Sequence, residues 1–197
     1  MIIRKLFKFE GAHKVFNCSS DRCKYSNHGH SYTVELFFSS AGLDNGMMIV
    51  DFGLMKNSIK EFVDSFDHAY SMWCKMPEDE KADQKKYSQR WIEMPVSPSA
   101  EAYALMFFKV IDEMLELTKF NNGEHMPELV SVRVHETDTG YAEAFREDLD
   151  WAEFQTNEII FSTDAQPAWW SEFIEELDKP DWNRNKIFIN PIVEKQV

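Results

Sequence analysis

Three histidines near the start of the chain have the side chains and the spacing of a metal site. A single residue separates His28 from His30, so on an extended chain their imidazoles point to the same face. Gly29 between them lets the backbone or a ligand approach closely. His13 follows the first predicted strand, and a hairpin-like pairing of that strand with the one after His30 would bring His13 alongside. Three neutral imidazoles suit zinc and leave a fourth coordination position open for water or substrate, which is typical of a catalytic ion.

The same spacing has a second interpretation. Two histidines with a single residue between them also occur on strand edges as surface side chains that bind nothing. The upstream His13 adds to the case for a metal ion, but the spacing alone leaves both interpretations open.

Two stretches predict the strands that would carry these rings. Residues 2–9 read as a first strand, and residues 31–38 alternate at period two. The stretch 17–29 between them is too polar to be core. The turn signal Leu43–Gly46 predicts residues 47–50 as the second arm of a hairpin. The residues of 31–38 that are expected on one face are Tyr32, Val34, Leu36 and Phe38.

A change to helical spacing predicts two helices. The first spans residues 52–66. The second begins with Ser97 as its N-cap and Pro98 at its first position, and it ends at Asn121–Gly123. The expected buried stripe of the first helix is Phe52, Met55, Ile59, Phe62, Val63 and Phe66. That of the second is Ala104, Phe107, Phe108, Ile111, Met114 and Leu115.

Two further strands complete an α+β pattern. Residues 129–135 alternate, and a turn at Asp138–Gly140 leads to a last short strand near 141–146. The residues of 129–135 expected on one face are Val130, Val132 and Val134. The order β-β-β-α-α-β-β predicts an antiparallel sheet with two helices on one face.

Two segments stand outside this pattern. Residues 70–97 are charged and irregular, and they read as a long loop, with room for a short helix, inserted in a domain of residues 1–146. Residues 147–197 form a C-terminal extension with four of the six tryptophans and a helix expected from Ala168 to Leu177. We expect this extension to pack on the domain or on a neighbouring subunit.

Composition and charge argue against several kinds of partner. The 197 residues are 44% hydrophobic and 14% aromatic, which is typical of a globular chain. The net charge of −13 argues against non-specific binding to nucleic acid or to an anionic membrane. No apolar run approaches the roughly 18 residues that span a bilayer, and the N-terminus lacks a secretory signal, so we expect a cytoplasmic protein. The three cysteines suit free thiols.

Six motifs occur in a defined order between residues 7 and 146. They are Phe9–His13; Cys23 followed by His28–Tyr32; Gly46–Phe52 with Leu54 and Lys56; Phe66–His68; Pro98–Glu101; and Val134–Thr137. Together they resemble the 6-pyruvoyltetrahydropterin synthase and 6-carboxytetrahydropterin synthase family. The ordered set is far more specific than any one motif, and it covers about three quarters of the chain.

The resemblance implies an architecture and a substrate. The fold would be the tunnelling fold (T-fold), in which antiparallel sheets of several subunits join into a barrel. The protein would be a homo-oligomer, a trimer or a hexamer, with active sites at subunit interfaces. The substrate would be 7,8-dihydroneopterin triphosphate or a close relative. His13, His28 and His30 would hold Zn2+, which would make the protons of the side-chain hydroxyls and of the adjacent carbon easier to remove.

The resemblance assigns the role of the base to Cys23. A thiol near a metal cation, and near Arg22 or Lys24, is expected to react as a thiolate. An inert, half-buried cysteine is the alternative, and Cys18 is a weaker substitute. Four residues separate Cys23 from His28, whereas the carboxy-forming enzymes typically have three and the pyruvoyl-forming enzymes five, so the product stays open.

Asp67 and His68 correspond to the family's catalytic dyad. A carboxylate beside an imidazole fixes its tautomer and raises its basicity, which suits proton shuttling. The alternative is a pair at a helix end that only caps the helix. The Leu-Asn that follows the dyad in the family is absent, and residues 69–72 read Ala-Tyr-Ser-Met instead.

Glu136 corresponds to the residue that anchors the pterin. One carboxylate can accept both hydrogens of the ring's 2-amino and N3 edge. Thr137, and Ser99 and Ala100 at a helix start, would add hydrogen bonds. Glu101 completes the set, although a first-turn glutamate is also favoured by the helix dipole alone.

Two functions of different classes remain. One is a lyase that uses zinc to convert 7,8-dihydroneopterin triphosphate to 6-carboxy-5,6,7,8-tetrahydropterin, as in the pathway to queuosine, with 6-pyruvoyltetrahydropterin formation as an alternative of the same class. The other is a zinc-containing pterin- or purine-binding protein without catalysis. Lys14, Arg22, Lys24 or a neighbouring subunit would meet the triphosphate. The product, the oligomer count and the roles of residues 70–97 and 147–197 stay open.

Overall fold

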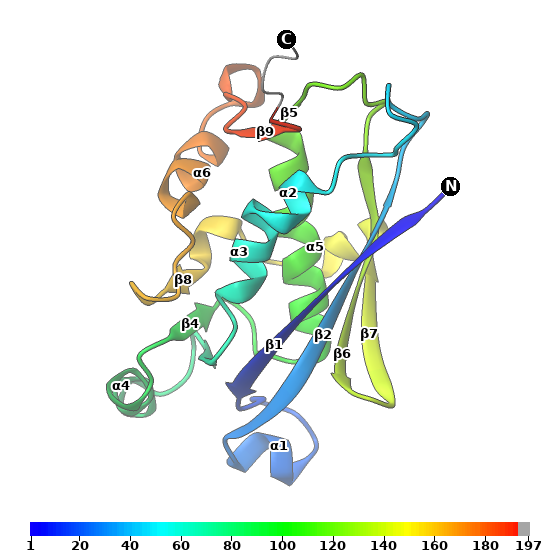
Figure 1. Ribbon diagram of the computed structural model, residues 1–197. Coiled ribbons are helices and arrows are strands. Elements are labelled where there is room, and N and C mark those ends of the chain that lie inside the picture. The colour runs from blue at the N-terminus through cyan, green and yellow to red at the C-terminus, as the bar shows by residue number, and fades with distance from the viewer. Residues whose placement is uncertain (193–197) are drawn as a thin grey trace.

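A seven-stranded sheet is the larger of two sheets in the part of the chain that the computed structural model describes, residues 1–192 (Figure 1). The strand order is β7-β6-β2-β1-β3-β4-β8. Within it β7, β6, β2 and β1 are antiparallel neighbours. Their bounds are β1 (Ile3–His13), β2 (His28–Ser39), β6 (Glu128–Thr137) and β7 (Gly140–Phe145). The buried residues of β2 include Tyr32, Val34, Leu36 and Phe38, which confirms the face predicted for residues 31–38.

The long helix α5 (Ala100–Glu116) packs against β6 and β7. Ser99 is its N-cap, because the Ser99 hydroxyl accepts a hydrogen bond from the backbone N–H of Ala102 at 3.2 Å. The predicted start at Ser97 and the predicted end at residues 121–123 are therefore both wrong. The predicted buried stripe is confirmed by the burial of Ala104, Phe107, Phe108, Ile111, Met114 and Leu115.

The predicted helix 52–66 is two short helices, α2 (Gly53–Lys56) and α3 (Ser58–Asp64). Asn57 separates them with a non-helical backbone at φ −107° and ψ −97°. The predicted stripe nevertheless faces the core. Phe52 is partly buried against it, and Met55, Ile59, Phe62, Val63 and Phe66 are buried.

Two details of the predicted sheet are wrong. Residues 47–50 form bends and not a strand, and β2 pairs with β6 instead of with a hairpin partner. Ile49 and Val50 are apolar because they pack into the core. A register shift in the pairing of β2 with β6 lies at Val130, so Leu129 takes the buried position predicted for Val130.

The segment 70–97 is not a long loop. It contains most of β3 (Ala69–Trp73), then α4 (Glu78–Tyr87) and β4 (Trp91–Met94). Strand β3 pairs in parallel with the last three residues of β1, and β4 continues the sheet beyond β3.

The C-terminal extension contributes to the same core. Trp170, Phe173 and Phe188 are buried in it. Strand β8 pairs with β4, and β9 pairs with β5. The remaining elements are α1 (Asp21–Tyr25), β5 (Thr118–Phe120), η1 (Arg146–Trp151), η2 (Thr156–Glu158), β8 (Ile160–Phe161), α6 (Trp170–Leu177), η3 (Asp181–Asn183) and β9 (Phe188–Asn190). Among residues 1–192, no helix combines the length and the apolar character needed to cross a membrane.

Candidate metal centre and the cavities beside it

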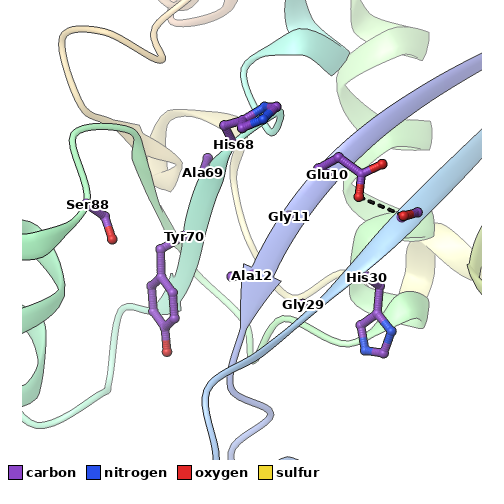
Figure 2. Close-up of a pocket in the computed structure, with 10 residues that line it drawn as sticks. Glu10, Gly11, Ala12, Gly29, His30, His68, Ala69, Tyr70 and Ser88 are labelled. Atoms are coloured by element: carbon purple, nitrogen blue, oxygen red, sulfur yellow. Dashed lines mark hydrogen bonds between the residues drawn. The ribbon is translucent and has the colours of Figure 1, made fainter.

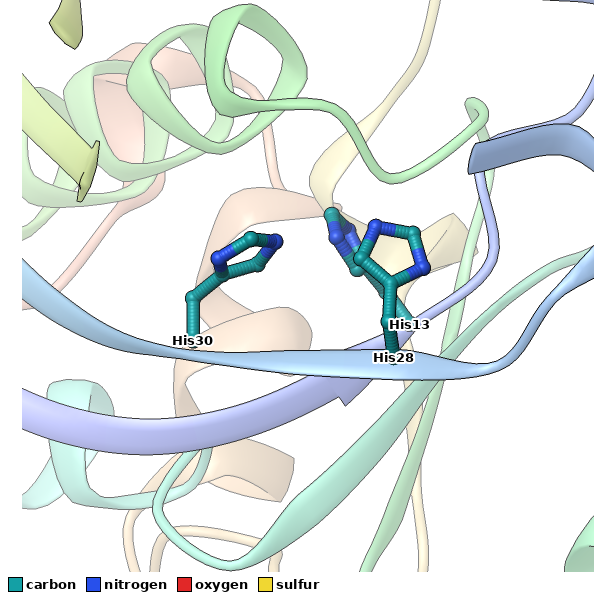
Figure 3. A group of neighbouring side chains, drawn as sticks. All are labelled: His13, His28 and His30. Atoms are coloured by element: carbon teal, nitrogen blue, oxygen red, sulfur yellow. The ribbon is translucent and has the colours of Figure 1, made fainter. Parts of the chain in front are cut away.

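The ends of two strands bring three imidazoles together (Figure 3). His13, the last residue of β1, pairs with His28, the first residue of β2, and His30 lies two residues along β2 on the same face. The ring centroids are 4.5 Å apart for His13 and His28, 5.3 Å for His13 and His30, and 5.2 Å for His28 and His30. One nitrogen from each ring lies within 4.8 Å of the other two.

Two backbone carbonyls determine which ring nitrogens carry protons. Nδ1 of His13 lies 2.6 Å from the carbonyl oxygen of Pro98, and Nδ1 of His28 lies 2.9 Å from that of Ser26. A carbonyl oxygen can only accept, so we assign the proton to Nδ1 in both rings, which leaves Nε2 with a free lone pair. Histidines that bind a metal are commonly oriented in this way through their other nitrogen.

Burial leaves the centre with ring nitrogens that can bind a cation. His13 is completely buried, and this burial lowers the pKa of its ring to about 4, so the ring is neutral at neutral pH. Nε2 of His30 is also buried and has no hydrogen-bond partner among the described residues. A buried ring nitrogen without a partner is costly, and coordination to a metal would satisfy it. The donor set and its spacing therefore fit a zinc ion.

Tyr32 belongs to this centre, although the sequence pattern placed it only in the core. Its side chain is completely buried, and its hydroxyl lies 3.3 Å from each ring nitrogen of His13. Burial raises the pKa of Tyr32, so the hydroxyl keeps its proton. The period of the strand contained the signal, because Tyr32 lies two residues beyond His30 on the same face.

A cavity of about 390 Å³ opens beside the centre. Its lining includes all five residues that the resemblance assigned to substrate binding, which are Ser99, Ala100, Glu101, Glu136 and Thr137. Oε1 of Glu136 lies 3.5 Å from Nε2 of His13 and 3.9 Å from Nε2 of His30. The carboxylate of Glu136 thus adjoins both the cavity and the imidazoles.

Cys23 lines the same cavity from the short helix α1. Its carbonyl oxygen accepts a hydrogen bond from the backbone N–H of Val15 at 3.0 Å. This bond joins the two halves of the loop between β1 and β2. Cys18 also lines the cavity, and its thiol donates to the carbonyls of Val15 and Ser20 at 3.2 Å and 3.3 Å. The four-residue spacing between Cys23 and His28 therefore still brings the thiol to the cavity that contains Glu136.

Asp67 and His68 form a hydrogen-bonded pair directly before β3. Nδ1 of His68 lies 2.9 Å from Oδ2 of Asp67, and the backbone N–H of Glu10 donates to Oδ1 at 2.8 Å. Burial opposes the ionisation of Asp67, but the bonds from Glu10 and His68, with the nearby charge of Arg90, lower its pKa overall. His68 has a left-handed backbone at φ +54°, and its N–H donates to the carbonyl of Glu10 at 2.6 Å. The ring of His68 is exposed.

His68 lines a second cavity, of about 430 Å³ (Figure 2). Glu10, Ala12, Gly29 and Ser31, which line this cavity, alternate along β1 and β2 with residues that face the helices. His30 of the imidazole trio also lines it, so the two cavities meet the centre at this residue and at Glu136. Within residues 1–192, one chain does not bring Cys23 and His68 into one cavity.

The predicted phosphate-binding residues are not assembled around either cavity. Nζ of Lys14 lies 2.7 Å from Oε2 of Glu80 on α4. Arg22 and Lys24 are not among the residues that line the two cavities.

The fold and the centre define a class: an α+β protein whose sheet carries three convergent imidazoles beside a cavity with a carboxylate. Residues 2–147 match the 6-pyruvoyl tetrahydropterin synthase family, and the chain belongs to this family. It is 40% identical over 173 residues to a 6-carboxy-5,6,7,8-tetrahydropterin synthase of Helicobacter pylori, a match that covers 86% of each protein.

Solved structures agree on the fold. The chain is similar to an uncharacterized protein from Wolinella succinogenes, with a TM-score of 0.59 at 18% identity over 74% of this chain and 98% of that one. It is also similar to a 6-pyruvoyl tetrahydropterin synthase from Plasmodium vivax, with a TM-score of 0.52 at 17% identity over the same shares. The predicted α+β T-fold of the subunit is therefore confirmed.

Proposed function

We propose that this protein is a zinc-dependent pterin synthase that converts 7,8-dihydroneopterin triphosphate to 6-carboxy-5,6,7,8-tetrahydropterin. The observation that carries the proposal is the convergence of His13, His28 and His30 beside the cavity that contains Glu136. The name of the Helicobacter pylori relative supports the carboxy-forming reaction. Its product would serve the synthesis of 7-deazapurines such as queuosine.

Glu136 would orient the substrate. Its carboxylate accepts the two hydrogens of the ring's 2-amino and N3 edge, a charge-assisted pair of hydrogen bonds. Thr137 and the start of α5 line the same cavity and add polar groups to it. A zinc ion bound to the imidazoles supplies Lewis acidity, which lowers the cost of removing protons from the side-chain carbons and hydroxyls.

Cys23 would act as the base. Its loop reaches the cavity that contains Glu136, so a ring held by the carboxylate would place its side chain in a cavity that Cys23 also lines. General-base catalysis by a positioned side chain contributes typically 10²–10⁴-fold. Cys18 donates its S–H to two carbonyls, an arrangement that suits a packed thiol better than a base.

Asp67 and His68 would serve the active site of a neighbouring subunit. The pair would act as a proton shuttle, with the proton on Nδ1 of His68 donated to Asp67 and with Nε2 left to exchange protons. His68 lines a cavity that Cys23 of the same chain does not line. A homo-oligomer, trimer or hexamer, in which this cavity meets another subunit would supply the dyad in trans.

Turnover of zinc-loaded protein with 7,8-dihydroneopterin triphosphate, with the products identified by mass, tests the proposal. The expected result is 6-carboxytetrahydropterin with release of acetaldehyde. A pyruvoyl pterin with loss of triphosphate would show the sister reaction instead. Pterin binding without any product would contradict an enzyme and favour a binding protein.

A further inference from the structure

We propose that the inserted segment 70–97 positions the loop that carries Cys23, and that Tyr70 and Glu80 are its positioning residues. The loop, residues 14–27, connects β1 to β2 and so begins and ends beside predicted metal ligands. The inference rests on the proposed function, in which Cys23 acts as the base.

The loop has little structure of its own to hold Cys23. Its helix α1 is five residues long, has no side-chain N-cap and contains no buried residue. A helix this short gains too little from its own hydrogen bonds to be stable alone. The backbone hydrogen bond from Val15 to Cys23 lies within the loop and does not join it to the rest of the chain, so contacts from outside the loop determine where Cys23 lies.

The first contact is at the start of the loop. Lys14 directly follows His13, and its Nζ lies 2.7 Å from Oε2 of Glu80 on the inserted helix α4. The side chain of Lys14 is 15% exposed and that of Glu80 is 41% exposed, so water still partly screens this ion pair.

The second contact is at the end of the loop. The hydroxyl of Tyr70 on β3 donates to Oδ1 of Asn27 at 2.8 Å, and Asn27 directly precedes His28. Figure 2 shows the hydroxyl of Tyr70 pointing away from His68. Burial, with a smaller effect of the Glu80 charge, raises the pKa of Tyr70, so the hydroxyl remains a donor.

A third set of contacts holds the first turn of the loop. The hydroxyl of Ser97 accepts from the backbone N–H of Phe16 at 2.8 Å and lies 3.2 Å from the Phe16 carbonyl. The ring of Phe16 lies 5.7 Å from that of Trp73. Phe16 also packs on a small apolar cluster, separate from the main core, whose buried members are Tyr70, Met72 and Met76. The insertion thus contacts both ends and the first turn of the loop.

The test uses two conservative variants in a background in which Cys18 and Cys74 are serine, so that Cys23 is the one thiol. Tyr70→Phe removes the hydroxyl and keeps the ring, and Glu80→Gln removes the charge. The matched controls are Tyr87→Phe and Asp79→Asn, two exposed side chains of the same helix α4. The zinc-loaded proteins are compared in the alkylation rate of Cys23 by iodoacetamide, in kcat and KM, and in zinc content.

A looser loop exposes the thiol more often and aligns it less well. Each variant should raise the alkylation rate at least about threefold and lower kcat by about three- to tenfold, with KM and zinc content close to the controls. Alkylation rates equal to those of the controls would overturn the proposal. A fall in zinc content in step with kcat would also overturn it, since the effect would then lie in the metal centre. If the parent protein has no turnover, the proposed function fails, and the alkylation rates still decide whether the insertion holds the loop.

Discussion

Oε1 of Glu136 lies 3.5 Å from Nε2 of the completely buried His13. The two residues come from β6 and β1, which are separated in the sheet by β2. Side chains on the same face of three adjacent strands therefore converge at one point, with His30 of β2 between them. This convergence joins the proposed anchor of the pterin ring to the proposed metal centre.

Replacement of Glu136 by glutamine should weaken substrate binding strongly. The amide accepts through one oxygen only and presents a donor to the donor edge of the ring, so a charge-assisted pair of bonds is lost. We expect KM to rise about 10- to 100-fold with zinc content unchanged. Glu147→Gln is the control, because Glu147 is an exposed glutamate that follows the end of β7, and it should change KM less than twofold. An unchanged KM in Glu136→Gln would show that this carboxylate does not hold the ring.

Two variants that are each inactive should give an active enzyme when they are co-expressed and form mixed oligomers. Cys23→Ala removes the proposed base, and His68→Ala removes the exposed half of the dyad. Because these residues line different cavities of one chain, an active site completed by a neighbouring subunit needs only one intact residue from each. Co-expressed variants should assemble with measurable turnover, whereas each alone should have none. Mixed oligomers as inactive as the separate variants would place both residues in the site of one chain.

Stability should depend on pH through Glu176 on α6. This side chain is 6% exposed, and it accepts hydrogen bonds from the backbone and side chain of Asn185 and from Lys179. The bond from the Asn185 backbone, followed by those from Lys179 and the Asn185 side chain, lowers the pKa of Glu176 to about 2. The ionised form is the stabilising one, so its contribution is complete above the ordinary value of 4.5 and disappears as the pH falls through about 2.

Thermal unfolding of Glu176→Gln measures this contribution. The variant should have a lower Tm than the parent between pH 5 and pH 7, and the difference should shrink as the pH approaches 2. Glu172→Gln, an exposed residue of the same helix, should match the parent throughout. A Tm difference for Glu176→Gln that stays constant with pH would contradict the account.

The sequence predicted the elements whose side chains alternate between core and solvent. Tyr32, Val34, Leu36 and Phe38 on β2 show this alternation plainly, and they are buried. Strand β3 escaped prediction because four of its five residues are buried, so its sequence does not alternate. Its parallel neighbour β1 lies about 60 residues away in the chain, and no local pattern records that pairing.

The local sequence pattern predicted the wrong helix start at Ser97 and Pro98, two residues that contact the candidate site. Ser97 and Pro98 have the residue types of a helix start. The hydroxyl of Ser97 instead accepts a hydrogen bond from the backbone N–H of Phe16, and the carbonyl of Pro98 lies within hydrogen-bond distance of Nδ1 of His13. Tertiary demands of this kind override local propensity most often at functional sites. The spacing of His28 and His30 and the pairing expected for His13 suggested the imidazole trio, and the resemblance to the family decided in its favour.

The coordination of bound zinc tests the central claim most directly. X-ray absorption at the zinc edge of the metal-loaded protein should show three imidazole nitrogens at about 2.0–2.1 Å and at least one oxygen from water, without sulfur. The water oxygen should be replaced when the pterin triphosphate is added. A closed shell of four protein ligands, with the sulfur of Cys23 or the carboxylate of Glu136 as a fourth that the pterin does not displace, would contradict the account.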